Sequence, residues 1–233
     1  MRPASATLRA VPLLCVCLAG CSGLFQSKAK PEQTYYLRAP PRTAGTAPAA
    51  GASAAAAATP ATPASLRVIR PAAGPGLDTS HIMLVQADRR MNFFSGSRWP
   101  APAPQVIEAL AVETLRGSGA WTSVQGSASP FPADYLLQIH LQRFEADYGE
   151  GAGAPVVHAV LDCIIGRREG REVLATFTVS GSTAAAANRL GEVVIAFEQA
   201  TGAALEALSQ QTEQAVREDR PPREIAPDPT EQH

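Results

Sequence analysis

The sequence predicts an α+β fold, in which a mainly antiparallel sheet carries two amphipathic helices packed on one face, as a two-layer sandwich. Two observations support this prediction. Apolar and polar side chains alternate with a period of two over residues 135–148, 157–165 and 173–179, as strands with one buried face require. Apolar side chains recur at helical spacing over residues 104–117 and 188–210, which indicates one short and one long helix.

Residues 1–20 have the pattern of a secretory signal peptide. Arg2 and Arg9 make the start positive, and an apolar run from Ala10 to Ala19 follows, too short to span a bilayer. The Leu-Ala-Gly-Cys sequence that ends at Cys21 resembles the lipobox of bacterial lipoproteins. The resemblance implies that the leader is removed and that Cys21 is lipidated on its thiol and its new amine by fatty acids such as palmitate. The alternative is an ordinary signal peptide followed by a chance cysteine.

The residue after the lipidated cysteine bears on sorting. Bacterial lipoproteins with Asp at that position tend to stay at the inner membrane, and this chain has Ser22 instead. In a bacterium with two membranes, the resemblance therefore implies an outer-membrane lipoprotein, lipid-anchored and facing the periplasm. Anchoring through more than one acyl chain is stable, because each buried CH₂ contributes about 0.8 kcal/mol.

Residues 21–64 are expected to form the lipidated N-terminus and a linker. From Pro40 to Ala64 nearly every residue is Ala, Pro, Thr, Gly or Ser, a composition that cannot bury a core. One short β-prone strand, residues 34–37, interrupts the first part. The sequence leaves open whether Tyr35 to Leu37 packs on the domain that follows or on a partner.

The folded domain is expected over residues 65–212. Its first half combines short strands with one helix: Pro71 and the Asp88-Arg89 turn each end a β-prone run, and Pro104 suits the first turn of a helix. The predicted elements of this half are strands at 66–69, 81–86 and 91–94, a helix at 104–117 and a strand at 121–124.

The second half is predicted as a three-stranded antiparallel meander followed by the long helix. In the first strand, Tyr135 to Leu141 keep one apolar parity and Phe144 to Tyr148 keep the other, so we expect a β-bulge near Gln142-Arg143. The helix is expected to end near Gln210. The charged and proline-rich residues 213–233 are expected to form a disordered tail.

Composition excludes some classes of function. The 233 residues carry a net charge of −1, which becomes −3 once the two leader arginines are removed, so the chain offers no basic field for nucleic acid. With the leader removed and Cys21 acylated, Cys163 is the single remaining thiol, so no internal disulfide can form. The fold must therefore be held by its apolar core.

No pattern of side chains indicates catalysis, a metal or a cofactor. The four histidines lack a metal-binding spacing, and the apolar parity of Cys163 predicts a core residue rather than a nucleophile. Glu145 and Asp147 share a strand face, but a hydrated sheet face explains them, and no nucleophile accompanies them. Neither a G-x-S-x-G elbow nor a G-x-x-x-x-G-K-[ST] phosphate loop occurs. We expect no enzyme activity and no cofactor or metal.

Three aromatic residues, Phe93, Phe94 and Trp99, are candidates for a partner interface. They lie close to Met91 in a segment that also holds three arginines. Packing in the core is the alternative, and it explains at least two of the apolar side chains. Because successive strand residues point to opposite faces, one of Phe93 and Phe94 is expected at the surface. We predict that this segment contributes to a surface for a partner or a neighbouring subunit.

The order of the elements and several local sequences resemble the ABC-type transport auxiliary lipoproteins, a family that includes the intermembrane-transport lipoprotein of the paraquat-inducible system. The resemblance covers most of the chain from Cys21 to about Gln210, with the long Ala/Pro linker as a departure. The specificity of the resemblance lies in the order in which the following local sequences occur along the chain. The sequences are Thr34-Tyr35-Tyr36-Leu37, Gly76-Leu77-Asp78-Thr79, Arg98-Trp99, Asp134-Tyr135, Pro155 and Ala196-Phe197-Glu198-Gln199-Ala200.

The resemblance implies a non-enzymatic docking or capping subunit at the outer membrane. Such lipoproteins work with a periplasmic protein of the mammalian-cell-entry (MCE) type and, through it, with an ABC permease and ATPase. Phospholipid or another hydrophobic molecule would then pass between the membranes. The chain would contact the membrane through its lipid anchor, and a homo-oligomer is compatible with this role.

Two other functions remain open from the sequence. One is a structural pilot or chaperone lipoprotein for another outer-membrane assembly, which a fold alone does not distinguish. The other is a lipid-anchored periplasmic hydrolase, which would need a nucleophile, a base and an acid that the sequence does not supply together.

Overall fold

The computed structural model describes residues 31–40, 62–150 and 153–219. The helices and strands described below belong to one compact unit, residues 32–233. The predicted α+β class is confirmed. The elements are β1 (Gln33–Thr34), β2 (Thr62–Val68), β3 (Ala72–Ala73), β4 (His81–Val85), β5 (Met91–Arg98), α1 (Ala103–Gly117), β6 (Trp121–Gln125), β7 (Tyr135–Asp147), β8 (Val156–Arg167), a 3₁₀ turn η1 (Glu169–Arg171), β9 (Val173–Ala184) and α2 (Leu190–Asp219).

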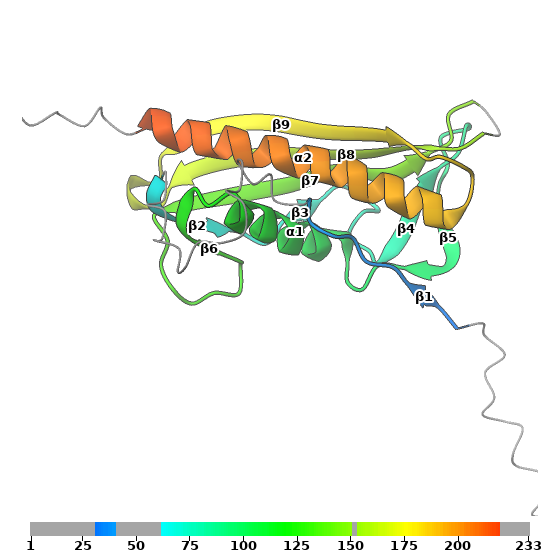
Figure 1. Ribbon diagram of the computed structural model, residues 1–233, viewed down its shortest axis with the longest axis horizontal. Helices are drawn as coiled ribbons and strands as arrows, with labels where there is room; N and C mark the ends of the chain where they lie inside the picture. The colour runs from blue at the N-terminus through cyan, green and yellow to red at the C-terminus, as the bar shows by residue number, and fades with distance from the viewer. Residues whose placement is uncertain (1–30, 41–61, 151–152, 220–233) are drawn as a thin grey trace, which may run out of the picture. The chain divides into compact units, whose positions relative to one another are not determined.

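Strand β7 lies at the centre of the sheet and pairs with four other strands, more than any other described strand does (Figure 1). Along one edge it pairs with β8 in antiparallel fashion, and β9 follows β8 in the same way. Along the other edge it pairs in succession with β2, β3 and β4, all three parallel to it. Outside these, β6 joins β2 in parallel, β5 joins β4 antiparallel, and β1 joins β5 in parallel.

The sheet is therefore mixed, with the predicted antiparallel meander as one half. The parallel half arises because the chain from Thr62 to Val85 advances along the edge of β7 without reversing. Pro71 lies between β2 and β3, where a residue without an N–H interrupts the ladder. The first reversal comes at the turn between β4 and β5, where Arg89 adopts a left-handed conformation with φ 64°.

The predicted bulge in β7 is present. The register between β7 and β8 shifts between Leu141 and Arg143. Before the shift, Ile139 and Leu141 are buried, and after it Phe144 and Ala146 are buried. The extra residue thus keeps apolar side chains on the inner face along the whole strand.

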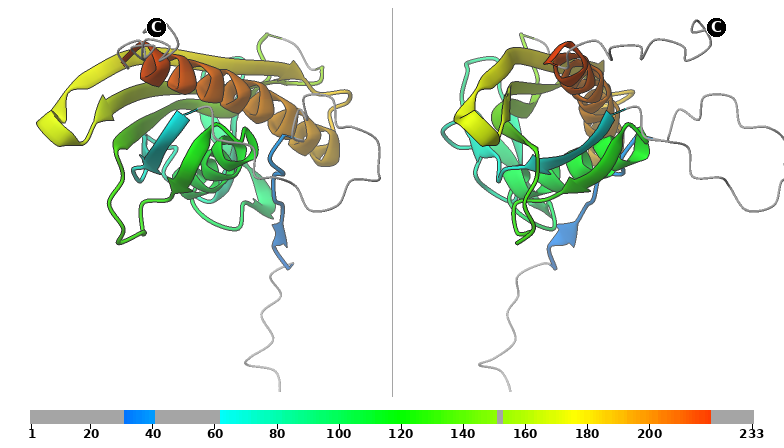
Figure 2. Two further views of the ribbon diagram at one scale, coloured as in Figure 1. Left: turned by 60° about the vertical axis from the view of Figure 1, so that its left-hand side comes forward. Right: turned by 90° about the vertical axis from the view of Figure 1, so that its left-hand side faces the viewer.

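Both helices bury an apolar stripe in the same core, and they contact each other. Helix α1 packs against β2 and β6, and α2 lies along β8 and β9 (Figures 1 and 2). The contact between α2 and β9 is closest at Gly181, where a Cβ would lie only 1.8 Å from the carbonyl oxygen of Ala200. The glycine lets the helix backbone rest directly on the strand.

Helix α2 is longer than predicted. The expected end near Gln210 is wrong, because the helix continues to Asp219 and includes residues assigned to the tail. Its buried stripe continues through Thr212 and Val216, and its end is fixed to the sheet. The Tyr135 hydroxyl donates a hydrogen bond to Asp219 Oδ2 at 3.1 Å, and Arg167 forms an ion pair with the same carboxylate.

The core is centred on three aromatic side chains, Trp99, Phe144 and Phe197, all at most 1% exposed. The ring centroids of Phe144 and Phe197 lie 5.0 Å apart, and that of Trp99 lies 5.3 Å from Phe197 and 5.8 Å from Phe144. These spacings are in the range that aromatic pairs prefer. The cluster joins the segment after β5 to β7 and α2.

We predict that Gly181→Ala will destabilise the domain by about 2 kcal/mol or more, because α2 must move away from β9 to admit the methyl group. Urea unfolding measures the difference. Gly191→Ala is the matched control: nothing lies within 4 Å of its added Cβ, and alanine favours the helix there. Equal stability of the two variants would contradict the close helix–strand contact.

Candidate docking surfaces

Trp99 is not part of a surface. Its side chain is fully buried between Phe144 and Phe197, so its inclusion in the predicted partner interface is wrong. The residue follows β5, and its backbone N–H donates to the carbonyl oxygen of Ser80 at 2.7 Å, which turns the side chain into the core. Phe94 also packs against the core and is half-buried.

Phe93 is exposed, in keeping with the alternation of strand residues. It is 45% exposed and its ring is stacked on His81, with 4.3 Å between centroids. Across the β4–β5 ladder, Met83 lies opposite Phe93 and Val85 lies opposite Met91, which is 46% exposed. Directly opposed residues share a face. These five residues, His81, Met83, Val85, Met91 and Phe93, form what we call the β4–β5 outer face, of which Met83 is partly buried and also contacts the core.

The β4–β5 outer face is held by an ordered hairpin. The Gln86 N–H donates to the Arg90 carbonyl oxygen at 3.0 Å, and the Arg89 N–H donates to the Gln86 carbonyl oxygen at 2.8 Å. The Arg90 Nε lies 2.5 Å from Asp88 Oδ2 across the turn. A solvated face of an antiparallel ribbon is normally polar. An apolar face on a fixed hairpin is instead typical of an interaction surface.

Residues 31–40, which we call the strap, pack on this domain. Strand β1 pairs with β5, and the Tyr35 N–H donates to the Arg98 carbonyl oxygen at 2.9 Å. Leu37 is buried at 7% exposure. Arg38 lies 3.1 Å from Glu198 on α2, and this hydrogen-bonded partner raises the pKa of the Arg38 guanidinium. The question that the sequence left open is thus answered: Tyr35 to Leu37 joins this domain.

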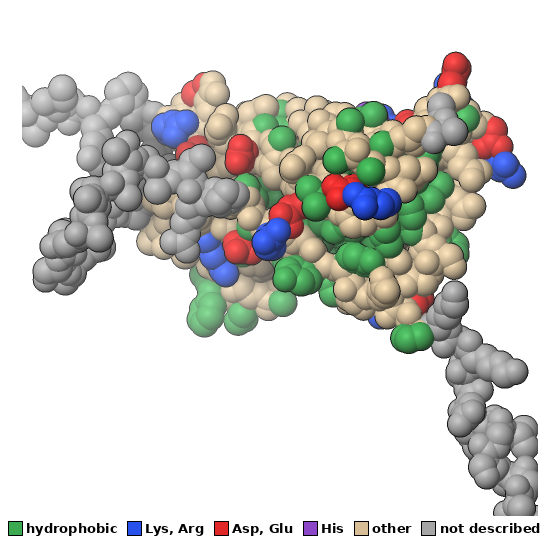
Figure 3. All heavy atoms as spheres, turned by 45° about the vertical axis from the view of Figure 1, so that its right-hand side comes forward, with side chains coloured by type: hydrophobic (Ala, Val, Ile, Leu, Met, Phe, Trp, Pro, Cys, Tyr) green, Lys and Arg blue, Asp and Glu red, His purple; other side chains and the backbone are tan. Residues whose placement is uncertain are grey.

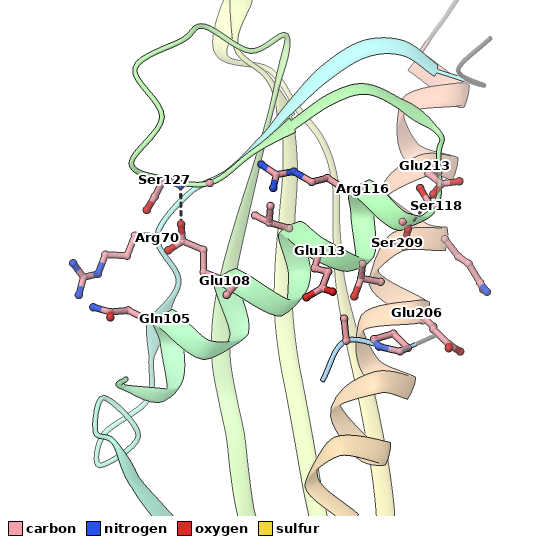
Figure 4. A pocket seen from close by; sticks show the side chains of 18 of the residues that line it. Arg70, Gln105, Glu108, Glu113, Arg116, Ser118, Ser127, Glu206, Ser209 and Glu213 are labelled. Atoms are coloured by element: carbon pink, nitrogen blue, oxygen red, sulfur yellow. Dashed lines mark hydrogen bonds between the residues drawn. The ribbon is translucent and has the colours of Figure 1, made fainter. Parts of the chain in front are cut away.

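A groove of about 1120 Å³ lies between α1 and α2 (Figure 4). Its walls come from five parts of the chain: the end of the strap, the segment between β2 and β3, α1 with Ser118 after it, the loop after β6, and α2. Four carboxylates and two guanidinium groups line it. They are Glu108, Glu113, Glu206, Glu213, Arg70 and Arg116, and between them lie small or apolar residues that include Ala39, Pro40, Ala109, Val112 and Ala128.

Cys163 is a core residue, as the sequence predicted. It is fully buried, and burial, with a smaller contribution from the charge of Asp162, raises the pKa of its thiol to about 12. The thiol is therefore neutral at physiological pH, where a nucleophile or a metal ligand would need the thiolate.

The carboxylates of Glu145 and Asp147 are tied to one arginine. Arg143 Nε lies 2.6 Å from Glu145 Oε1, and another nitrogen of the same guanidinium lies 3.3 Å from Asp147 Oδ2. Glu145 is buried and also accepts a hydrogen bond from the Phe144 N–H at 2.7 Å. His158 lies opposite Glu145 in the ladder, and burial, followed by the charge of Arg143, lowers its pKa. An ion-pair network explains this cluster.

The predicted lipidation and sorting residues, Cys21 and Ser22, lie outside the described residues. Within the described ranges, no helix combines the length and the hydropathy that a membrane span requires. Nor do the side chains placed by the structure include a group of three or more that could hold a metal ion.

Sequence reasoning found the β4–β5 hairpin and missed the groove. Alternation predicted that one of Phe93 and Phe94 is exposed, since this needs only the local period of the strand, and the structure shows that it is Phe93. The lining of the groove comes from Arg70 and from residues 39–40, 105–118, 126–128 and 206–213, whose proximity depends on the tertiary fold. The β-prone run at 34–37 indicated a structured segment there, but its sequence did not show that the strap reaches α2.

Comparison with solved structures supports the fold. Protein XCC0632 from Xanthomonas campestris is similar, with a TM-score of 0.63 and 24% identity, covering 69% of this chain and 90% of that one. An uncharacterised protein matches with a TM-score of 0.54 and 13% identity, covering 82% of this chain and all of that one. A search of curated proteins gave no match.

The family model of the ABC-type transport auxiliary lipoprotein component matches residues 46–216. The match spans most of the chain and includes nearly all of the sheet, the core cluster and both helices described above. It also agrees with the resemblance of the ordered local sequences. The chain therefore belongs to the family of ABC-type transport auxiliary lipoproteins.

Proposed function

We propose that this protein is a non-enzymatic docking or capping subunit of an ABC-type, MCE-containing system for lipid transport between membranes. In this role it is anchored by Cys21 in the outer membrane, faces the periplasm, and holds an MCE-type protein that is linked to a permease and an ATPase. ATP chemistry would then belong to other subunits. Family membership supports the transport role.

The observation that carries the docking role is the apolar β4–β5 outer face. On a domain whose own core is complete, Phe93 and Met91 remain about half exposed on a hydrogen-bonded hairpin. Figure 3 shows that hydrophobic side chains gather on one side of the molecule beside acidic and basic ones, so the surface of this domain is not uniformly polar. Pre-ordered apolar surfaces of this kind favour binding, because little side-chain and backbone entropy is lost on association.

The chemistry of the buried groups supports a role without catalysis. Cys163 holds a neutral thiol in the core, and the Glu145 carboxylate is occupied by Arg143 and a backbone N–H. Neither group is presented to a substrate in a form that acid–base or nucleophilic chemistry uses.

The lipid anchor has a direct test. Cells supplied with labelled palmitate should label the wild-type chain and a Cys163→Ser control, while Cys21→Ala should carry no label and should leave the outer-membrane fraction. The reason is that Cys21 supplies the thiol and, after cleavage, the amine that are acylated. Label that persists in the Cys21→Ala chain would refute the anchor.

The docking role is tested by co-purification from detergent-solubilised envelopes. We expect Phe93→Ser to reduce recovery of the MCE-type protein at least about fivefold, since loss of a central apolar contact typically costs more than 1 kcal/mol. Phe131→Ser is the control, because Phe131 is 68% exposed elsewhere on the surface. Unchanged recovery with Phe93→Ser would remove the β4–β5 outer face from the proposal. Consistent absence of the MCE-type protein from the wild-type complex would overturn the function itself.

The neutral thiol predicts a pattern of reactivity. In a chain that starts at Ser22, Cys163 is the sole thiol, and iodoacetamide at pH 8 should leave it unmodified until urea unfolds the domain. Because the folded pKa is raised from 9.0 to about 12, the thiol should also make the folded state less stable as pH rises from 9 towards 12. A Ser95→Cys variant, exposed on β5, serves as the reactive control. Rapid modification of native Cys163 would contradict its burial.

A further inference from the structure

We propose that the groove between α1 and α2 receives a basic, amphipathic helical segment of the transport partner. This inference deepens the proposed function and rests on it. The groove is separate from the β4–β5 outer face, since none of the five residues of that face lines it.

The charge of the groove points to a basic occupant. Four carboxylates face two guanidinium groups on its lining. Two of the carboxylates already have partners. Glu108 Oε1 accepts a hydrogen bond from the Ser127 N–H at 2.7 Å, and Glu213 forms an ion pair with Arg217 at 3.6 Å. Within the described part of the chain, Glu113 on α1 and Glu206 on α2 make no hydrogen bond or ion pair. Each helix wall therefore offers, among the residues that the structure describes, a carboxylate without a partner to a Lys or Arg side chain.

The two guanidinium groups of the groove offset only half of the charge of its four carboxylates. Arg116 is held against β6, because its Nε donates to the Val124 carbonyl oxygen at 2.9 Å. Figure 4 shows Arg70 beside Gln105 at one end, while Glu113 lies between α1 and α2 and the remaining labelled acids of α2 lie along the other wall. The charged side chains labelled on α2, Glu206 and Glu213, are acidic, so a partner segment bound in the groove would face negative charge on that side.

The shape of the groove favours a helix over an extended segment. Both walls are helices, whose backbone groups are satisfied internally, so an added strand would find no ladder to join. A helix brings its own satisfied backbone.

The floor suits an apolar stripe on such a helix. On α1, Ala109 is exposed and Val112 is buried at 8% exposure, while Pro40 of the strap lies beside Gly202 of α2. Small side chains let two helices approach closely, and an i, i+3, i+4 apolar stripe matches this arrangement. The occupant is therefore a helix with one face of apolar residues, flanked by Lys or Arg.

Photo-crosslinking in cells tests the inference. The full-length lipoprotein carries p-benzoylphenylalanine at Ala109 in the groove, or at Ala203, an exposed alanine of α2 outside the lining. We expect the Ala109 probe to form an adduct with the MCE-type protein, and peptide mapping to place it in a Lys/Arg-bearing segment with helical apolar spacing. The Ala203 probe should give no such adduct.

A charge series provides an independent measurement. Binding of the purified lipoprotein to the MCE-type protein is followed by biolayer interferometry at low and high salt. Each exposed ion pair contributes about 1.4- to 5-fold in affinity, so Glu113→Gln with Glu206→Gln should weaken binding about 2- to 25-fold at low salt and flatten its salt dependence. Glu169→Gln, exposed in the β8–β9 turn, is the matched control and should leave both unchanged.

The outcomes separate the two proposals. An Ala109 adduct that maps to residues 41–61 of the same chain or to a second copy overturns the helix-binding groove. Co-purification of the MCE-type protein with no Ala109 adduct, or with an unaltered salt dependence in the double variant, also overturns it and leaves the docking function standing. If no MCE-type protein binds the wild-type chain, both proposals fall.

Discussion

The packing of Trp99 against Phe144 and Phe197 is the contact on which the rest of the structure depends. It joins three parts of the chain that are far apart in sequence: the segment after β5, the bulged strand β7 and helix α2. Each aromatic pair contributes about 0.5–1.5 kcal/mol beyond the burial of its area. The indole Nε1 of Trp99 has no hydrogen-bond partner among the described residues, which costs about 1–3 kcal/mol. The free energy gained by packing the indole in the core must therefore exceed the cost of leaving its N–H without a partner.

The exposed surfaces follow from this cluster. Because Phe94 packs against the core, the alternation of β5 directs its neighbour Phe93, and Met91 with it, outward. In the same way, the inner stripes of α1 and α2 bury their apolar side chains and leave Glu113 and Glu206 on the walls between the helices. The two candidate docking surfaces thus consist of outward-facing residues on the same strands and helices whose inward-facing residues build the core.

Local periodicity predicted the elements well and their spatial pairing poorly. The alternation of β7, β8 and β9 and the bulge near Gln142 were readable because they depend on neighbouring residues. The parallel course of β2, β3 and β4 along β7 was not, since pairing between distant segments leaves no local pattern. The end of α2 was placed too early because charged residues after Gln210 resemble a tail, while Thr212, Ala215 and Val216 continue the buried stripe. Trp99 was misassigned because composition cannot show which way an aromatic side chain turns.

The contacts of the strap determine which elements of the domain would receive a force applied from the N-terminal side. The Arg38 side chain of the Arg38–Glu198 ion pair is exposed, and exposed ion pairs contribute little to stability. Burial of Leu37 contributes more, about 1.5–3 kcal/mol for a leucine side chain, and β1 adds backbone pairing to β5. In the proposed role, a force from the lipid anchor would therefore reach β5 and α2 first. These elements carry the β4–β5 outer face and one wall of the groove, so the proposed anchor and the candidate docking surfaces would share the same elements of the fold.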